Sequence, residues 1–207
     1  MSTTDLVMPS LDGGRGTPRP YLSLMDVGSY VDYLIVDKVW TTRLDADGKP
    51  VFKIDERGLP VLKDGEPVAK KKLIVTAYAT GTHSGAEVGT GARRQNAWEG
   101  RAPSRGAVFL VHLQGTNCYD FGSACDAFSK ENGREVRVGD KVRQTFTRVD
   151  ANPKGGNDRR VQSFKLRPLV LTDPDERAMA VEVLRVMEAV KSGQGDEVAE
   201  ESGRNGG

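Results

Sequence analysis

Short runs in which apolar and polar residues alternate are the feature that most limits what this chain can fold into. Side chains of a strand point alternately to two faces, and β-branched and aromatic residues favour strands, so five such runs are expected to be strands. Between the third and fourth runs, residues 118–130 instead space their apolar side chains every three or four positions, which predicts a helix. The five expected strands cover residues 30–42, 73–79, 107–113, 142–149 and 161–171.

This order is that of an OB fold, a five-stranded Greek-key barrel with a helix between strands 3 and 4. Other small β-barrels and α+β sheets share the order. A narrower signal lies in the last hairpin, where Val138-Gly139-Asp140 launches the fourth strand and Gly155-Gly156-Asn157 precedes a fifth strand that carries Phe164. This hairpin resembles that of the single-stranded-DNA-binding proteins of tailed phages that infect actinobacteria. The resemblance covers residues 105–170 well and residues 28–80 loosely, and it implies both the fold and single-strand binding.

The expected organisation is a mainly β protein: a five-stranded OB-fold barrel with an inserted hairpin region and a C-terminal helix. Residues 1–28 contain Gly and Pro at short intervals and are expected to form a flexible leader. The barrel is expected over residues 29–171, with exposed hairpins inserted within 50–72. Residues 172–192 predict a helix that either pads the barrel or pairs with a neighbouring subunit, and 193–207 predict a disordered acidic tail.

The formal net charge of only +1 over 207 residues conceals an uneven distribution. Residues 134–167 hold ten Lys or Arg against four acids, a local charge of +6, whereas residues 172–207 hold nine acids against four bases, a local charge of −5. The first stretch suits a nucleic-acid surface. The acidic tail either solubilises the protein or, as the resemblance implies, recruits replication or recombination proteins. It lacks the Phe-terminated tip of the bacterial relatives.

The polar, Gly-rich loop after the second strand is the first candidate binding element. Single-strand binders need cations along the phosphate track and aromatic faces on which bases stack. Basic residues surround one tryptophan in this loop, which either forms a stacking clamp or covers a local apolar patch. The loop residues concerned are Arg93, Arg94, Trp98, Arg101 and Arg105.

The connection between the last two strands is the second candidate, because in OB folds it flanks the ligand groove. Its Lys154, Arg159 and Arg160 either follow phosphates or belong to a solvated hairpin tip. Cationic side chains on the polar face of the last two strands extend this positive track: Arg143, Lys165 and Arg167.

Three aromatic residues on strands are candidates for either the core or the groove. The ring of Tyr78 faces away from Leu73 and Val75, so it lines either the groove or the core. By strand alternation Trp40 lies on the same face as Leu34 and Val36, so it is expected in the core. Phe146 is also expected in the core.

Catalysis is not expected, and neither is a metal or a cofactor. The chain has no phosphate-binding Gly-rich loop, nucleophile elbow or zinc-protease helix motif. Its two histidines lie far apart, and Asp32 and Asp37 are expected to face solvent. Cys118 and Cys125 are expected to be buried free thiols.

Single-stranded DNA and a second subunit are therefore the expected partners, and a membrane is not. With no apolar run of about 18 residues and no signal-peptide pattern, a cytoplasmic location is expected. The alternative function is a structural or host-directed protein-interaction module built on an OB barrel.

Overall fold

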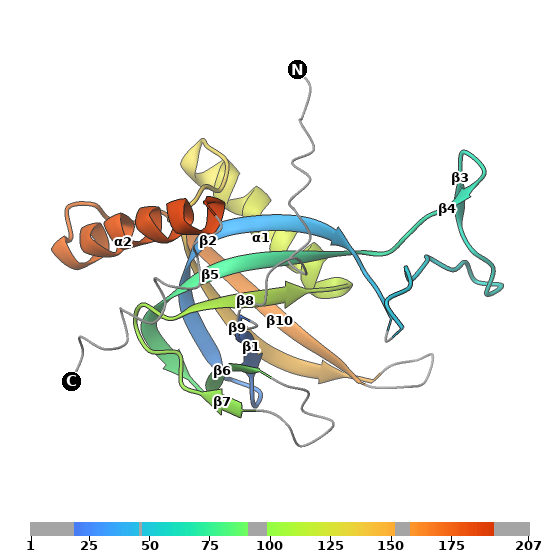
Figure 1. Ribbon diagram of the computed structural model, residues 1–207, viewed down its shortest axis with the longest axis horizontal. Helices are drawn as coiled ribbons and strands as arrows, with labels where there is room; N and C mark the ends of the chain where they lie inside the picture. The colour runs from blue at the N-terminus through green and yellow to red at the C-terminus, as the bar shows by residue number, and fades with distance from the viewer. Residues whose placement is uncertain (1–18, 46, 91–98, 152–157, 193–207) are drawn as a thin grey trace.

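A single eight-stranded sheet and two helices make up the fold of this protein, described here from a computed structural model (Figure 1). The structure describes residues 19–45, 47–90, 99–151 and 158–192. The elements are β1 (Tyr21–Leu24), β2 (Tyr30–Thr42), β3 (Leu62–Lys63), β4 (Glu66–Pro67), β5 (Lys71–Ser84), β6 (Ala86–Thr90), β7 (Glu99–Arg101), β8 (Val108–Leu113), α1 (Thr116–Asn132), β9 (Lys141–Asp150), β10 (Arg159–Arg167) and α2 (Pro174–Lys191). The large sheet has the strand order β10-β9-β2-β5-β8-β1-β6-β7, and β3 and β4 form a separate hairpin.

The five expected strands and the expected helix are confirmed as β2, β5, β8, α1, β9 and β10. They run side by side, and each pair of neighbours is antiparallel. Strand β5 is longer than expected, because residues 80–84 continue the strand and pair with Tyr30 and Val31 at the start of β2. The mainly β class and the position of the helix therefore follow from the sequence pattern.

The sheet is not a closed five-stranded barrel, since β8 and β10 form no ladder within the described residues. The free edge of β8 is instead taken by β1, which runs parallel to it. This corrects the expectation of a flexible leader through residue 28: Tyr21–Leu24 form a strand, and Leu24 is buried in the core.

Side chains rather than a ladder satisfy the backbone at the outer edge of β10. The Asn117 amide of α1 donates to the Arg160 carbonyl at 3.0 Å and accepts from the Gln162 N–H at 3.1 Å. The Arg160 guanidinium donates to the carbonyls of Leu24 and Met25, at 3.1 and 3.3 Å. Because an unpaired strand edge exposes strong donors and acceptors, these contacts hold β10 near β1 without strand pairing.

The main core lies on the inner face of the sheet and is covered at one end by α1. Phe121 and Phe128 of this helix are buried. They lie on the face of the helix opposite to its exposed polar residues, as their spacing predicts. The helix ends at Gly133, whose φ of 63° is the left-handed conformation that glycine adopts most easily. Phe146 is also in this core, which confirms that expectation.

A second core lies on the opposite face of the sheet, beneath α2. Met179, Val183 and Val186 of this helix pack against Leu34 and Val36 of β2. The helix begins as its sequence predicts, with the Asp173 carboxylate accepting the N–H groups of the first turn. Of the two alternatives for this helix, its packing against the sheet is what the structure shows.

Trp40 is 57% exposed, so the expectation that it enters the core is wrong. A register shift between Ile35 and Asp37 inserts an extra residue into β2 and reverses the alternation of side chains beyond it. The shift places Trp40 on the face of Leu73 instead of that of Leu34, but Trp40 stands near the end of β2, outside the buried cluster, and therefore remains exposed.

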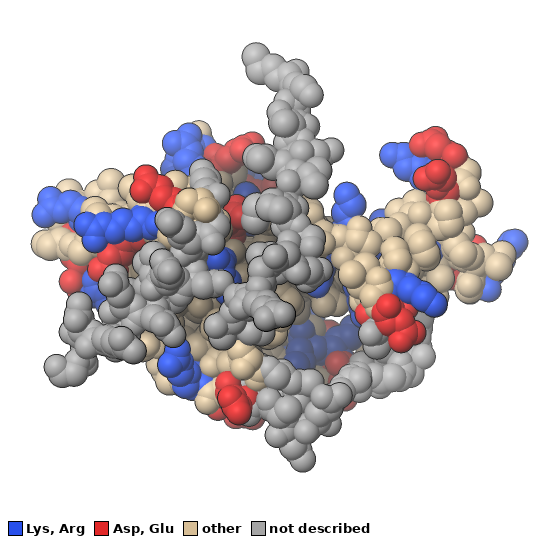
Figure 2. All heavy atoms as spheres, in the orientation of Figure 1, with Lys and Arg blue, Asp and Glu red and all other residues tan. Residues whose placement is uncertain are grey.

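The inserted hairpins form an arm, residues 43–70, that projects from the ends of β2 and β5 (Figure 1). Isolated bridges join Leu44 to Pro50, Phe52 to Ala69 and Ile54 to Pro60. Lys and Arg side chains lie beside Asp and Glu side chains over its surface (Figure 2). Neither buried cluster includes a residue of the arm.

Within the described ranges, neither helix is long and apolar enough to cross a membrane.

Candidate functional site

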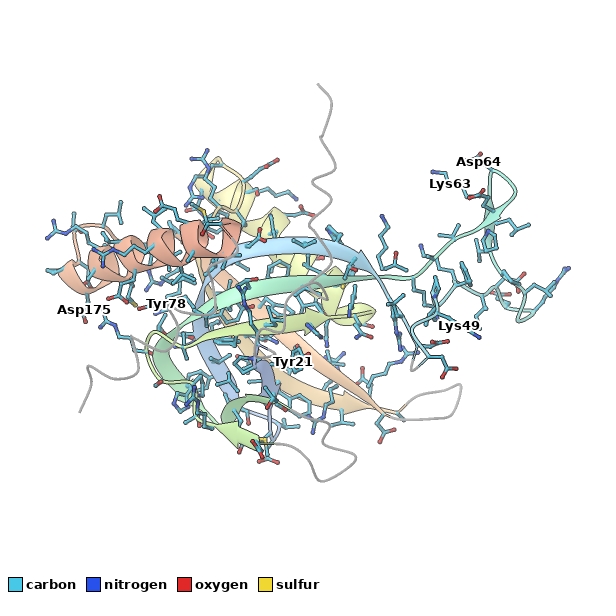
Figure 3. The ribbon with its side chains drawn as sticks, viewed as in Figure 1. Tyr21, Lys49, Lys63, Asp64, Tyr78 and Asp175 are labelled. Atoms are coloured by element: carbon cyan, nitrogen blue, oxygen red, sulfur yellow. The ribbon has the colours of Figure 1, made fainter. Side chains whose placement is uncertain are left out.

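A row of apolar and aromatic side chains crosses the outer face of β2, β5, β8 and β1 beyond the area covered by α2. Ile74 lies opposite Val39 on one side and His112 on the other, and all three point away from the inner core. Tyr21 continues the row, and its ring centroid is 4.8 Å from that of His112, with the ring planes tilted by 58°. Figure 3 shows Tyr21 near the middle of the sheet. We call Val39, Ile74, His112 and Tyr21 the aromatic row.

The imidazole of His112 is electrically neutral at ordinary pH. Desolvation, and to a smaller extent repulsion by the nearby Lys72 ammonium, together lower its pKa to about 4. A neutral flat ring beside a tyrosine offers a surface on which another flat ring can stack.

Four cations lie where the arm joins the sheet. Lys72 shares the outer face of Ile74 and lies near His112, whereas Lys71 shares the face of the inner-core residue Leu73. Lys71 and Lys72 begin β5 opposite Thr42 and Thr41, and the Arg43 N–H donates to the Lys70 carbonyl at 2.8 Å. None of Arg43, Lys70, Lys71 and Lys72 forms an ion pair with another described residue. We call these four residues the cation cluster of the arm.

Tyr78 does not line a surface groove, and that prediction is wrong. It does face away from the inner core, as expected, but α2 covers this part of the outer face and leaves Tyr78 only 2% exposed. Its hydroxyl donates to the Glu182 carboxylate of α2. Figure 3 shows the side chain at the α2 side of the sheet, away from Tyr21.

Arg143 and Lys165 lie opposite each other on β9 and β10, but Arg143 is held by a buried acid. Asp32 on β2 accepts hydrogen bonds from Arg143 Nε at 2.6 Å and Nη2 at 2.9 Å, and its carboxylate lies 3.3 Å from the Lys141 ammonium. The expectation that Asp32 faces solvent is therefore wrong. Asp32 therefore largely neutralises the charge of Arg143 within the protein.

Arg167 is also paired internally, because its guanidinium binds the Glu176 carboxylate at the start of α2. This contact and the Val170 N–H, which donates at 2.6 Å, lower the pKa of Glu176 to about 2, with the Arg167 hydrogen bond as the largest cause. Lys165 remains exposed. Of the three strand cations that were expected to extend a positive track, only Lys165 lacks a partner among the described residues.

The remaining described candidates lie in different places. Arg160 supports the edge of β1 and stacks over Phe146, with 5.0 Å from its guanidinium carbon to the ring centroid. Arg159, beside it, is exposed. Arg101 shares the face of Val88, opposite to the face of Tyr21, and Arg105 lies 3.7 Å from the Asp175 carboxylate.

Four predicted residues lie outside the described part of the chain: Arg93, Arg94, Trp98 and Lys154.

Several cations of the basic stretch 134–167 are paired within the protein. Five of its nine described Lys and Arg residues form ion pairs with acids: Arg134, Lys141, Arg143, Arg148 and Arg167. Arg134, for example, binds both carboxylate oxygens of the buried Asp140, at 2.6 and 2.8 Å. A count of charges along the sequence therefore overstated the free positive surface of this stretch.

Sequence reasoning missed the aromatic row and the cation cluster of the arm. Tyr21 was assigned to a leader, and His112 was read only as part of an apolar strand. The run Lys70-Lys71-Lys72 was a usable signal, because three consecutive cations at the start of a strand cannot all be neutralised locally. What the sequence did not show is that β1 places Tyr21 beside β8.

The described residues hold no group of three or more His, Cys, Asp or Glu side chains that is arranged to bind a metal ion. Cys118 and Cys125 are free, half-buried thiols on α1, and burial raises the pKa of both.

Comparison with known proteins finds no matching family model, and neither the curated proteins nor the solved structures include a match to this chain.

Proposed function

We propose that this protein binds single-stranded DNA, with little sequence preference, along the aromatic row on the outer face of β5 and β8. The observation that carries the proposal is the Tyr21–His112 ring pair, with centroids 4.8 Å apart, near Lys72, which has no acidic partner among the described residues. Stacked rings and a cationic track are the two features that sequence-tolerant single-strand binders combine. Replication or recombination of a phage genome is the process in which we place this activity.

The arrangement of strands supports an OB-type binding face. The neighbour order β10-β9-β2-β5-β8, with α1 between β8 and β9, matches the strand order of an OB barrel, and we infer that β1 stands in the gap between β8 and β10. In OB folds, strands 2 and 3 and the loops 1–2 and 4–5 bind oligonucleotides. Those positions correspond to β5, β8, the part of the arm that joins the sheet and the connection that follows β9. The arm and the arrowhead of β9 lie toward the same side of the molecule (Figure 1).

The chemistry of the face favours a flexible strand over a duplex. Base rings stack on aromatic side chains when they are free of a partner strand, and each stack contributes roughly 1–3 kcal/mol. Lys72 lies on the face of the row, and Lys70 and Lys71 directly precede it in the chain, where these cations can neutralise phosphates and release counterions. The affinity is therefore expected to fall as salt rises.

The test is fluorescence anisotropy with a labelled oligo-dT at two salt concentrations. Replacing both rings, Tyr21→Ala with His112→Ala, should weaken binding by about 5- to 150-fold for each stack that is lost. Lys71→Gln with Lys72→Gln should weaken binding and reduce its salt dependence. The matched control, Lys130→Gln with Arg185→Gln, removes two exposed cations from the helices and should leave the affinity unchanged.

Two results would contradict the proposal. The first is an absence of oligo-dT binding by the natural chain, and the second is binding that the ring and lysine replacements leave unaltered. If the chain binds but only Lys165→Gln and Arg159→Gln weaken the complex, the DNA lies on the outer face of the β9–β10 hairpin instead.

A protein-interaction module is the second candidate function, favoured by the exposed apolar side chains of the arm. It predicts no binding to oligo-dT at either salt concentration. In both functions we propose a non-enzymatic protein of the host cytoplasm. Recruitment of replication or recombination proteins by the acidic tail, residues 193–207, stays a prediction, because these residues lie outside the described part of the chain.

A further inference from the structure

The arm contains a threefold sequence repeat, of which only the last residue, Lys70, belongs to the proposed binding face. The pattern Gly-X-Pro-Val-X-Lys occurs at residues 48–53, 58–63 and 65–70. Each copy follows a tight turn, and Asp45 and Asp55 stabilise the first two turns by accepting N–H groups two and four residues ahead at 2.8–2.9 Å. The repeat therefore specifies three similar short hairpin strands.

The three copies bond to one another through their backbones. The Lys70 N–H donates to the Val51 carbonyl at 2.7 Å, the Lys53 N–H donates to the Val68 carbonyl at 2.8 Å, and the Val68 N–H donates to the Val61 carbonyl at 2.9 Å. This network fixes the backbone of the arm. No second layer covers it, since neither buried cluster reaches the arm.

Large apolar side chains consequently remain in solvent on the arm. Six of them are 37–60% exposed: Leu44, Phe52, Ile54, Leu59, Val61 and Leu62. Scattered apolar side chains are normal on a protein surface, but a group of this size on one projecting element indicates an interface. A small hairpin assembly without a covering layer is also marginally stable by itself.

The charges of the arm favour a second copy of the same chain over a nucleic acid. Arg43 and Lys70 belong to the proposed binding face; between them, residues 44–69 have four Lys or Arg and six Asp or Glu, a net charge of −2, and both signs are interspersed (Figure 2). Figure 3 shows Lys49, Lys63 and Asp64 on the projecting arm. A nucleic-acid surface needs an excess of cations. A surface that carries both signs side by side can instead pair with its own copy about a twofold axis.

We propose that the arm is the contact between two copies of this chain, which form a dimer. In this dimer the apolar side chains of the two arms exclude water from each other, and Lys53 and Lys63, which end the first two repeats, face the acids of the partner's turns. The dimer does not depend on DNA.

The test is the mass of the full chain in solution, measured by sedimentation or light scattering without DNA over a range of concentrations. The expected mass is twice the 22.5 kDa of one chain. Leu59→Ser with Leu62→Ser should raise the dissociation constant of the dimer by at least about tenfold. Both side chains are exposed, so circular dichroism should show an unchanged fold.

The matched control is Leu171→Ser with Leu184→Ser, which replaces two leucines of similar exposure, 59% and 52%, at α2 and the segment before it. This control should remain dimeric. A monomeric natural chain at its highest soluble concentration overturns the proposal, as does an arm variant that keeps the mass of the natural chain. Dissociation of the control alone places the interface at α2. Because no DNA is present, these results do not depend on whether the chain binds oligo-dT.

Discussion

The buried carboxylate of Asp32 links β2 to β9, and its removal gives a sharp test of what the basic residues of β9 do. Asp32 is 2% exposed, whereas the Arg143 side chain that binds it is 47% exposed. Arg143 also lies over the Tyr30 ring, 4.8 Å from its centroid, and Lys141 lies 3.3 Å from the carboxylate. Two cations and one ring are thus positioned by a single acid.

We expect Asp32→Asn to lower the free energy of unfolding by about 2 kcal/mol. Loss of one partner of a fully buried ion pair costs about 3–5 kcal/mol, and a hydrogen bond to a charged group contributes about 1.5–3 kcal/mol. The cost here is at the low end because the half-exposed Arg143 can bind water when the carboxylate is gone. For a chain of this length, the change corresponds to a fall in Tm of about 4–8 °C.

The assay is urea unfolding of Asp32→Asn, Arg143→Met and the double variant, compared as a double-mutant cycle. A coupling energy of about 1 kcal/mol or more is expected, because each single change removes the same contact. Lys165→Met serves as the control, since Lys165 lies opposite Arg143 but is exposed. Additive effects of Asp32→Asn and Arg143→Met, or a loss below about 0.5 kcal/mol for Asp32→Asn, would refute the reasoning.

Two further predictions concern other parts of the sheet. The pKa of Glu176 is depressed to about 2, so its ionised form stabilises the fold by on the order of 1 kcal/mol after allowance for the exposed Arg167. This contribution is complete above about pH 4.5 and is lost as the pH falls toward 2. Between pH 6 and pH 3 the Tm of Glu176→Gln should therefore fall less than that of the natural chain, and equal falls would contradict this. A Cβ on Gly89 would lie 2.1 Å from the Glu99 carbonyl of β7, so Gly89→Ala should lower the free energy of unfolding, measured in urea, by about 1–3 kcal/mol. The control is Gly122→Ala in α1, where nothing lies within 4 Å of the added Cβ, and it should stabilise the protein. A neutral effect of Gly89→Ala would show that β7 moves freely.

The sequence by itself predicted the five central strands, the two helices and their order, but not β1, β6 and β7, which fall in segments expected to be a leader and a loop. Alternation of side chains predicted the strands, and the spacing of Phe121 and Phe128 predicted α1, because these periods reflect local backbone geometry. The start of α2 at Asp173 and Pro174 was also readable, since capping uses residues within one turn. Each of these features depends on contacts between residues that are close in the chain.

Only the tertiary structure decided which strands close the sheet and which side chains remain available for binding. The pairing of β1 with β8, which brings Tyr21 to His112, joins residues about 90 positions apart that carry no mutual signal in the sequence. The fates of Tyr78 and Arg143 depend in the same way on α2 and on Asp32, which lie far away in the chain. A side chain's charge and shape are local properties, but its exposure is set by whatever distant segment packs against it, and for that reason the candidate site emerged from the fold.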